Sequence, residues 1–195
     1  DLVRSRGLGD VYKRQSFIMT FVETFLNSYI KRALGYKELA DKTFAQLSDA
    51  DFHYQPNEAS NSIAVTMQHV AGNMHSRFTN FLTEDGEKAW RKRDEEFEDQ
   101  QWTKEALLKQ WNEAWHCYIN TVKHLTEDDL LKTITIRSEG LTVIDALNRQ
   151  LAHYPYHVGQ IVYIGRMIKN NDWQSLSIAK GQSQQFNAHM QQKHS

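Results

Sequence analysis

Apolar residues recur at every third or fourth position in four long stretches of the chain, and this spacing predicts four amphipathic helices. The stretches cover about 19–47, 62–82, 103–125 and 142–168. Thr103 and Thr142 stand where the third and fourth helices should begin, and threonine is a favoured residue at that position. Only two prolines occur in the whole chain. Because proline disrupts helix interiors, their scarcity permits long helices almost everywhere.

The segments between these stretches differ in character. Residues 48–61 are rich in loop formers, whereas residues 83–101 make a long connection with charges of both signs. The run of charges at 91–96 is typical of a solvated loop. Residues 132–143 alternate like a short strand and predict a turn at Glu139-Gly140. The pattern predicts an all-α fold, a four-helix bundle with a long crossover loop and a short β-like segment before the last helix.

Composition favours one domain and argues against several classes of function. The chain has 195 residues, of which 40% are hydrophobic and 24% charged. A net charge of −1 gives no basic field for nucleic acid. A single cysteine, Cys117, excludes an internal disulfide framework and a cysteine-based zinc site, and it fits a cytoplasmic protein. No apolar run approaches the roughly 18 residues that a membrane span needs.

Residues 1–15, DLVRSRGLGDVYKRQ, carry little apolar periodicity and need separate treatment. Their last six residues correspond to one reading frame of GATGTGTATAAGAGACAG, a transposon end used to prepare sequencing libraries. We therefore expect residues 1–15 to be a non-native scar and the natural start to be Met19, with a disordered native tail as the alternative. Residues 16–195 are expected to form a single domain.

A histidine pair in the fourth helix is the first candidate for chemistry. In LNRQLAHYPYHVGQIVYIGR, His153 and His157 lie four residues apart, which places both on one helix face. Two imidazoles in this arrangement can converge on a metal ion. Pro155 lies between them, and we predict a bend in a continuous helix because the apolar positions keep their phase across it. The alternative is a pair of packed or partly exposed histidines without a ligand.

One face of the second helix is polar but uncharged. It carries Ser62, Thr66, His69, Asn73, Ser76 and Asn80. A solvated face usually carries lysine and glutamate, whereas small neutral polar groups suit a wet cleft that holds an ion or ligand. His69 is the strongest candidate ligand on this face for a zinc-like metal. The alternative is a helix face covered by the long charged loop.

These two helices carry a resemblance to a known group of proteins. MQHVAGNMHSRF and HYPYHVGQIVYIGR resemble the DinB-like (YfiT-like) superfamily of metalloenzymes, whose pattern is one histidine from the second helix and an H-x-x-x-H-x-G-Q-I segment in the last. The resemblance covers about residues 19–170, and FLTEDGEKAWRKRDEEF and WQSLSIAKGQSQQFN are similar to one bacterial subfamily. Pro155 and Ala179 depart from the pattern.

The resemblance implies a specific centre. It assigns His69, His153 and His157 as ligands of a divalent metal ion, for which we expect zinc or nickel. It also implies a homodimer of four-helix bundles. The superfamily includes thiol-dependent transferases and isomerases and metal-dependent hydrolases.

The chemistry follows from the donor set. Three neutral imidazoles leave a divalent ion with open positions, where it can activate water for hydrolysis or ionise a thiol for transfer. Arg149 lies one turn before the histidine pair and could orient a substrate carboxylate. Asn73 and Gln160 each follow a histidine by one turn and are candidates to hydrogen-bond the ligands or the substrate.

We therefore predict a metal-dependent enzyme, a hydrolase or a thiol S-transferase, that acts on a small molecule such as a low-molecular-weight thiol. The alternative is a non-catalytic helical module that binds a ligand or a partner. A third interpretation is a dimerisation scaffold without metal.

Overall fold

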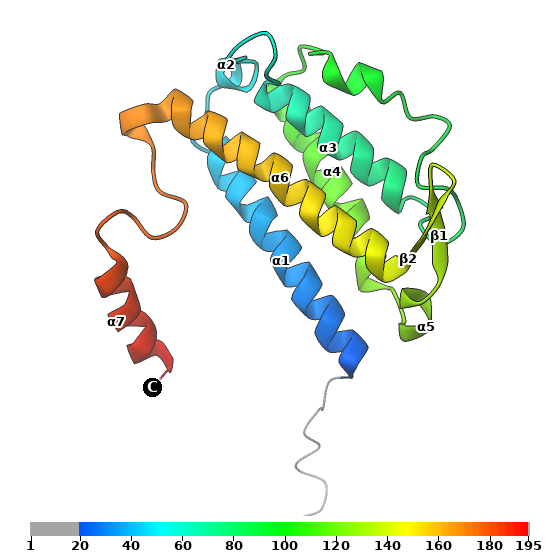
Figure 1. Ribbon diagram of the computed structural model, residues 1–195. Helices are drawn as coiled ribbons and strands as arrows, with labels where there is room; N and C mark the ends of the chain where they lie inside the picture. The colour runs from blue at the N-terminus through cyan, green and yellow to red at the C-terminus, as the bar shows by residue number, and fades with distance from the viewer. Residues whose placement is uncertain (1–19, 195) are drawn as a thin grey trace, which may run out of the picture.

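Four long helices dominate the computed structural model, which describes residues 20–194 (Figure 1). The elements are α1 (Phe21–Phe44), α2 (Asp49–Phe52), α3 (Ile63–Phe78), η1 (Asp94–Phe97), α4 (Lys104–Lys123), α5 (Glu127–Leu130), β1 (Thr133–Ile136), β2 (Glu139–Thr142), α6 (Val143–Lys169), η2 (Asn170–Asp172) and α7 (Ser183–His194). The expected scar at 1–15 and the expected start at Met19 lie outside the described residues. The all-α prediction is confirmed.

The four long helices pack as a closed bundle. Helix α1 contacts α4 and α6, and α3 contacts the same two helices from the other side. Figure 1 shows α3 and α6 running side by side, in keeping with their contact. The predicted four-helix bundle is therefore confirmed, and the α3–α6 contact is the one that brings the candidate histidines together.

The predicted starts of the third and fourth helices are correct. The Thr103 and Thr142 hydroxyls accept hydrogen bonds from backbone N–H groups three residues later, which satisfies donors that a helix start leaves unpaired. The end of α3 was predicted too late. The helix stops at Phe78 because Thr79 is extended and Asn80 has a positive φ of 49°, which turns the chain into the long connection.

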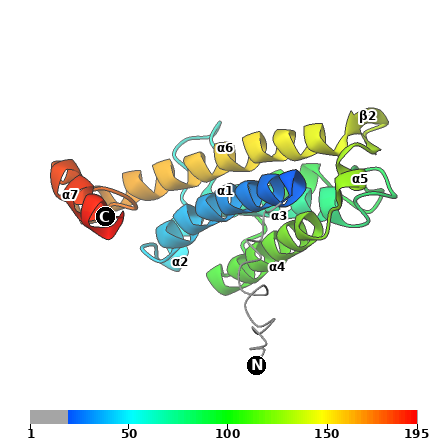
Figure 2. The same ribbon diagram turned by 90° about the horizontal axis from the view of Figure 1, so that it is seen from below.

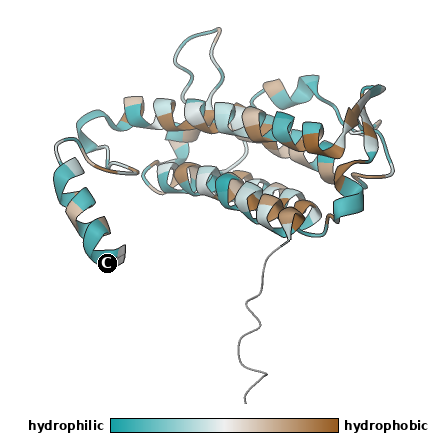
Figure 3. Ribbon diagram, turned by 60° about the horizontal axis from the view of Figure 1, so that its bottom comes forward, coloured by the Kyte–Doolittle hydropathy of each residue, from teal (hydrophilic) through white to brown (hydrophobic). Residues whose placement is uncertain are grey.

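A cluster of aromatic rings fills the centre of the bundle. Trp111, Trp115 and Tyr118 of α4 are buried, and the ring of Tyr118 lies 5.2 Å from that of Tyr154 on α6. Figure 3 shows apolar residues gathered on the faces that the helices turn toward one another. Buried rings of this size contribute much of the hydrophobic stabilisation of a small domain.

A hydrogen-bond relay fixes the first part of α6 inside this core. The Tyr118 hydroxyl donates to the Tyr29 hydroxyl over 2.7 Å, and Tyr29 donates to the Leu147 carbonyl over 2.8 Å. Burial raises the pKa of Tyr29 above its ordinary value, so the phenol stays protonated and keeps its donor. Three helices are thus tied together two turns before the histidine pair.

The short β segment forms a two-stranded antiparallel hairpin, but its turn differs from the prediction. Ile136 pairs with Glu139, so the turn lies at Arg137-Ser138 and not at Glu139-Gly140. Arg137 and Ser138 have positive φ values of 56° and 64°, the backbone of a tight two-residue hairpin turn. The Asp85 carboxylate accepts a hydrogen bond from both backbone N–H groups, at 2.9 and 2.8 Å. A contact from a distant loop therefore stabilises a turn whose own sequence does not favour it.

Helix α6 continues without interruption past Pro155, so the predicted continuity is confirmed, whereas the bend expected at the proline stays a prediction. Figure 2 shows it as one long rod. Pro155 borders a small gap against α1, together with Ala33 and Tyr36. The proline ring therefore lies on the side of α6 that faces α1, and it leaves the side that faces α3 to the histidines.

The C-terminal segment differs from the bundle. Helix α7 lies to one side of it in Figures 1 and 2 and is mostly exposed. Among residues 20–194, none of the helices combines the length and the apolar character that a membrane crossing requires.

Candidate metal centre

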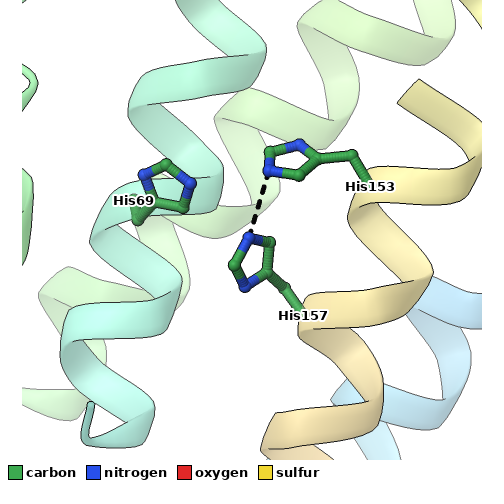
Figure 4. Close-up of side chains that lie close together, drawn as sticks. All are labelled: His69, His153 and His157. Atoms are coloured by element: carbon green, nitrogen blue, oxygen red, sulfur yellow. Dashed lines mark hydrogen bonds between the residues drawn. The ribbon is translucent and has the colours of Figure 1, made fainter. Parts of the chain in front are cut away.

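The three histidines predicted to bind a metal lie together between α3 and α6 (Figure 4). One ring nitrogen of each lies within 4.8 Å of the other two. The Nε2 atoms of His153 and His157 are 3.1 Å apart. Two nitrogens that share a tetrahedral zinc ion at about 2.0–2.1 Å lie roughly 3.3 Å apart, so the spacing of this pair is already close to that of two zinc ligands. Helix spacing sets the pair on α6, and packing of α3 supplies His69.

Hydrogen bonds on the outer side of two rings orient their inner nitrogens. The Nδ1 atom of His69 lies 3.0 Å from a carboxylate oxygen of Glu96, and Nδ1 of His157 lies 2.8 Å from Oε1 of Gln160. Both partners are acceptors, so we assign the proton of each ring to Nδ1. The lone pair of Nε2 then faces the centre. This is the arrangement in which proteins present histidine to a metal.

The surroundings of the pair on α6 favour its neutral form. Burial, followed by the charges of neighbouring histidines and arginines, lowers the pKa of His153 to about 3. Burial also lowers the pKa of His157, although the hydrogen bond to Gln160 opposes this shift. Both imidazoles are therefore neutral near pH 7, and the neutral ring is the form that binds a metal.

The connection between α3 and α4 supplies the carboxylate behind His69. Arg91 holds Glu96 with two hydrogen bonds of 2.7 Å each, and the two side chains are 2% and 11% exposed. Burial alone would raise the pKa of Glu96, but the hydrogen bonds from His69 and Arg91 outweigh it and lower the pKa. The charged run at 91–96 was predicted to be a solvated loop. That prediction is wrong for these two residues, because they form a buried ion pair against α3.

Two further features let this carboxylate reach the helix. A Cβ atom added to Gly72 would collide with Oε1 of Glu96, so the absence of a side chain at position 72 makes room for the carboxylate. The Phe97 ring lies on the His69 ring, with centroids 4.7 Å apart. Glu96 and Phe97 thus fix His69 from two directions.

The three predicted auxiliary residues have different surroundings. Gln160 contacts a candidate ligand directly, as described above for His157. Asn73 instead accepts a hydrogen bond from the buried Tyr154 hydroxyl over 3.1 Å. Arg149 forms a 3.7 Å ion pair with Glu139 and lies beside the histidines at the edge of a cavity.

The polar face of α3 combines both interpretations that the sequence left open. Its histidine and Asn73 border a cavity, as expected of a cleft. Ser76 is fully buried under the connection, where its hydroxyl donates to the Gly86 carbonyl over 2.7 Å. The face is therefore a cleft in its middle and a loop contact toward its end.

The cavity opens next to the histidine cluster and has a volume of about 470 Å³. His69 and His153 line one side of it. A volume of this size falls within the range of small-molecule sites. The arrangement provides a candidate centre and a space beside it in which a ligand could lie.

Glu96, Arg91 and Phe97 belong to the site but were not predicted from the sequence. Loop residues have no periodicity that would show which of them faces inward. One signal was available in Gly72, because a glycine inside a helix costs roughly 0.5–1 kcal/mol relative to alanine and often marks a close approach. Gly72 lies less than one helix turn after His69, so the close approach that it marks is next to the candidate ligand.

Comparison with known protein families gives a match over most of the chain. The model of the family described as "Protein of unknown function (DUF1572)" matches residues 20–182. The match covers all four long helices and the connection that carries Glu96. No curated protein matches the chain.

Proposed function

The chain belongs to the family of proteins of unknown function designated DUF1572, and we propose that it is a metal-dependent enzyme acting on a small molecule. His69, His153 and His157 would hold a divalent ion, zinc or nickel. Within this proposal the protein is a member of the DinB-like superfamily, in keeping with the four-helix bundle and the H-x-x-x-H-x-G-Q-I segment.

The observation that carries the proposal is the orientation of the rings. Two of the three histidines have acceptors behind Nδ1, and all three present a nitrogen to one point. The described residues supply three such ligands. Structural zinc sites commonly close with four protein ligands, whereas catalytic sites keep a position open, and the adjoining cavity suits the second kind.

Each residue near the centre has a distinct part in this proposal. A bound divalent ion supplies a Lewis acid that can activate water for hydrolysis or a thiol for transfer. Glu96 and Gln160 keep the ligand rings in the orientation and tautomer that bind the ion. Arg149 can orient an anionic substrate group at the cavity. Hydrolysis and thiol transfer are the two reactions that this set of groups supports.

Three further properties stay predictions. A low-molecular-weight thiol as one substrate and a homodimeric assembly follow from the resemblance, and a cytoplasmic location follows from the single cysteine. None of them is needed for the centre, because all three histidines come from one chain.

Metal analysis of protein purified without a histidine tag tests the proposal. We expect one equivalent of zinc or nickel per chain, and turnover either of a thiol with an electrophile or of an ester or amide. Absence of bound metal after loading with zinc and with nickel would overturn it. A full equivalent of metal without turnover of either substrate class would favour the non-catalytic binding module.

A further inference from the structure

The walls of the cavity beside the histidines carry an unusual concentration of one residue type. Five of its described lining residues are arginines, namely Arg77, Arg91, Arg93, Arg137 and Arg149, and none is acidic. They come from α3, the connection to α4, the hairpin turn and α6. Since the whole chain has a net charge of −1, the concentration of positive charge is a property of this cavity and not of the protein as a whole.

Three of these arginines are already held by carboxylates. Arg77 lies 3.1 Å from Glu87, Arg137 lies 2.9 Å from the same carboxylate, and Arg91 is bound by Glu96. Three positive charges therefore share two negative ones. These arginines hold the loops in place and also leave the cavity electropositive.

The other two arginines have weaker partners. Arg93 lies 3.6 Å from Asp94, and Arg149 lies 3.7 Å from Glu139. These distances exceed the 2.7–2.9 Å of a charge-assisted hydrogen bond, and all four side chains are well exposed. Exposed pairs of this kind contribute little to stability. The guanidinium groups are therefore able to bind something else.

Both of these side chains lie close to the candidate metal centre. Arg149 lies one turn before His153 on α6. The guanidinium of Arg93 lies 5.0 Å from the Phe97 ring centroid, and the same ring stacks on His69. The connection and α6 thus each present one arginine to the cavity, beside a different histidine.

We infer that Arg93 and Arg149 bind a carboxylate or phosphate group of the substrate. This inference rests on the proposed metal-dependent function, and it adds the chemical class of the substrate. A planar guanidinium matches either anion with two parallel hydrogen bonds, which fixes orientation as well as charge. The rest of a small anionic molecule would then lie toward His69 and His153, where the reaction takes place.

Binding of simple anions tests this inference. Isothermal titration calorimetry at low ionic strength would use succinate and inorganic phosphate as probes and uncharged succinamide as their control. The titrations would compare the wild type with Arg93→Gln and Arg149→Gln, in zinc-loaded and in metal-free protein. Arg166→Gln is the matched control variant, because Arg166 is an exposed arginine on α6 that does not line the cavity.

We expect Arg93→Gln and Arg149→Gln each to weaken binding of at least one anion about tenfold, the effect of losing a hydrogen bond to a charged group. Arg166→Gln should leave the affinity within about twofold, since a distant exposed charge is largely screened. Succinamide should bind far more weakly than succinate. The anion that depends on both arginines identifies the group as a carboxylate or a phosphate.

Two outcomes would overturn the inference. In the first, neither anion binds the wild type. In the second, the anions bind equally to the wild type and to both variants of the zinc-loaded protein, which would mean that they bind to the zinc ion and not to the arginines. Metal content, measured on the same samples, separates this failure from a failure of the proposed function. Protein that holds no metal but still binds anions through the two arginines would refute the metal enzyme and keep the anion site.

Discussion

Helix α6 and the connection between α3 and α4 both contribute to the candidate centre, by different physical means. On α6, two histidines and Gln160 lie within eight residues, and the geometry of one helix places them. In the connection, residues 79–103, the contributing carboxylate of Glu96 is placed by a buried arginine and by a glycine on another helix, and the neighbouring Phe97 ring packs on His69. The first arrangement is local and the second depends on tertiary contacts.

This difference has consequences for how the two regions respond to change. A helix face tolerates substitution of its neighbours, because backbone hydrogen bonds keep the spacing of the remaining side chains. A loop carboxylate held by a few contacts moves when any one of them is lost. We therefore expect α6 to determine whether metal binds, and the connection to determine how tightly.

The largest effect is expected from His157→Ala, which removes a ligand from α6. Metal affinity should fall more than about a hundredfold, beyond the 10–100-fold typical of losing a group behind a ligand. The circular dichroism spectrum should keep its helical shape, since the ring is only partly buried. His116→Ala, at an exposed position on α4, is the control. Retention of a full equivalent of tightly bound metal would refute the assignment of His157.

Glu96→Gln tests the connection with a change that keeps size and removes charge. The metal affinity should fall about 10–100-fold, because His69 loses the carboxylate behind Nδ1. Arg91 keeps a weaker partner in Glu87 at 3.5 Å, so the fold should persist. Competition with a chelator measures the affinity. Glu95→Gln is the control, because Glu95 is exposed and pairs only with Lys92 among the contacts described.

An unchanged metal affinity in Glu96→Gln would contradict the expectation that the connection determines how tightly metal binds. It would mean that α3 alone positions His69, and that the connection serves only as a cover over the helix.

Gly72→Ala approaches the same contact from the helix. The new methyl group would push the flexible carboxylate of Glu96 away from His69, so metal affinity should fall about tenfold or less. The stability of α3 should not fall with the affinity, because helix propensity favours alanine over glycine by up to about 1 kcal/mol. Gly35→Ala on α1 is the matched control, because a Cβ there meets nothing within 4 Å. Equal metal affinities in the two variants would show that Glu96 can bend aside without effect.

The smallest effect concerns the pH dependence of the metal-free protein. Burial lowers the pKa of His153 from an ordinary 6.5 to about 3, so the unfolded chain takes up this proton before the folded protein does. The free energy of unfolding should therefore be unaffected by this group above pH 6.5 and fall as the pH drops from 6.5 toward 3. Urea unfolding at pH 7 and pH 5 measures it. In His153→Gln the difference between the two pH values should be smaller, and an equal difference would contradict the prediction.

Much of the molecule could be predicted because its signals are periodic or local. The core positions Trp111, Trp115 and Tyr118 follow from three-four spacing, and the cap at Thr142 follows from residue type. The nearness of Gln160 to His157 is likewise a property of one helix turn. The inward position of His69 rested on the polar face of α3 and on the resemblance, and the packing of α3 against α6 bears it out.

Other features could not be predicted because they depend on contacts between distant segments. The hairpin turn lies at Arg137-Ser138 since Asp85, about fifty residues earlier, accepts both backbone N–H groups. Asn73 bonds Tyr154 because packing places the two helices in that rotation. In the run at 91–96, three basic residues followed by three acidic ones suit solvent and a buried pair equally well. Only the neighbouring α3 distinguishes Arg91 and Glu96 from the exposed residues between them.

The sequence alone was enough to predict the elements that need only their own residues: four amphipathic helices, the caps of α4 and α6, and the two histidines that share a face of α6. Only tertiary contacts determine which loop side chains are buried, how α3 and α6 bring three imidazole rings together, and which cavity is lined by five arginines. The physical reason is the distance along the chain between the residues that interact. Helix geometry repeats over a few residues and leaves a pattern in the chain, whereas burial and pairing of charges are set by segments that meet only after folding.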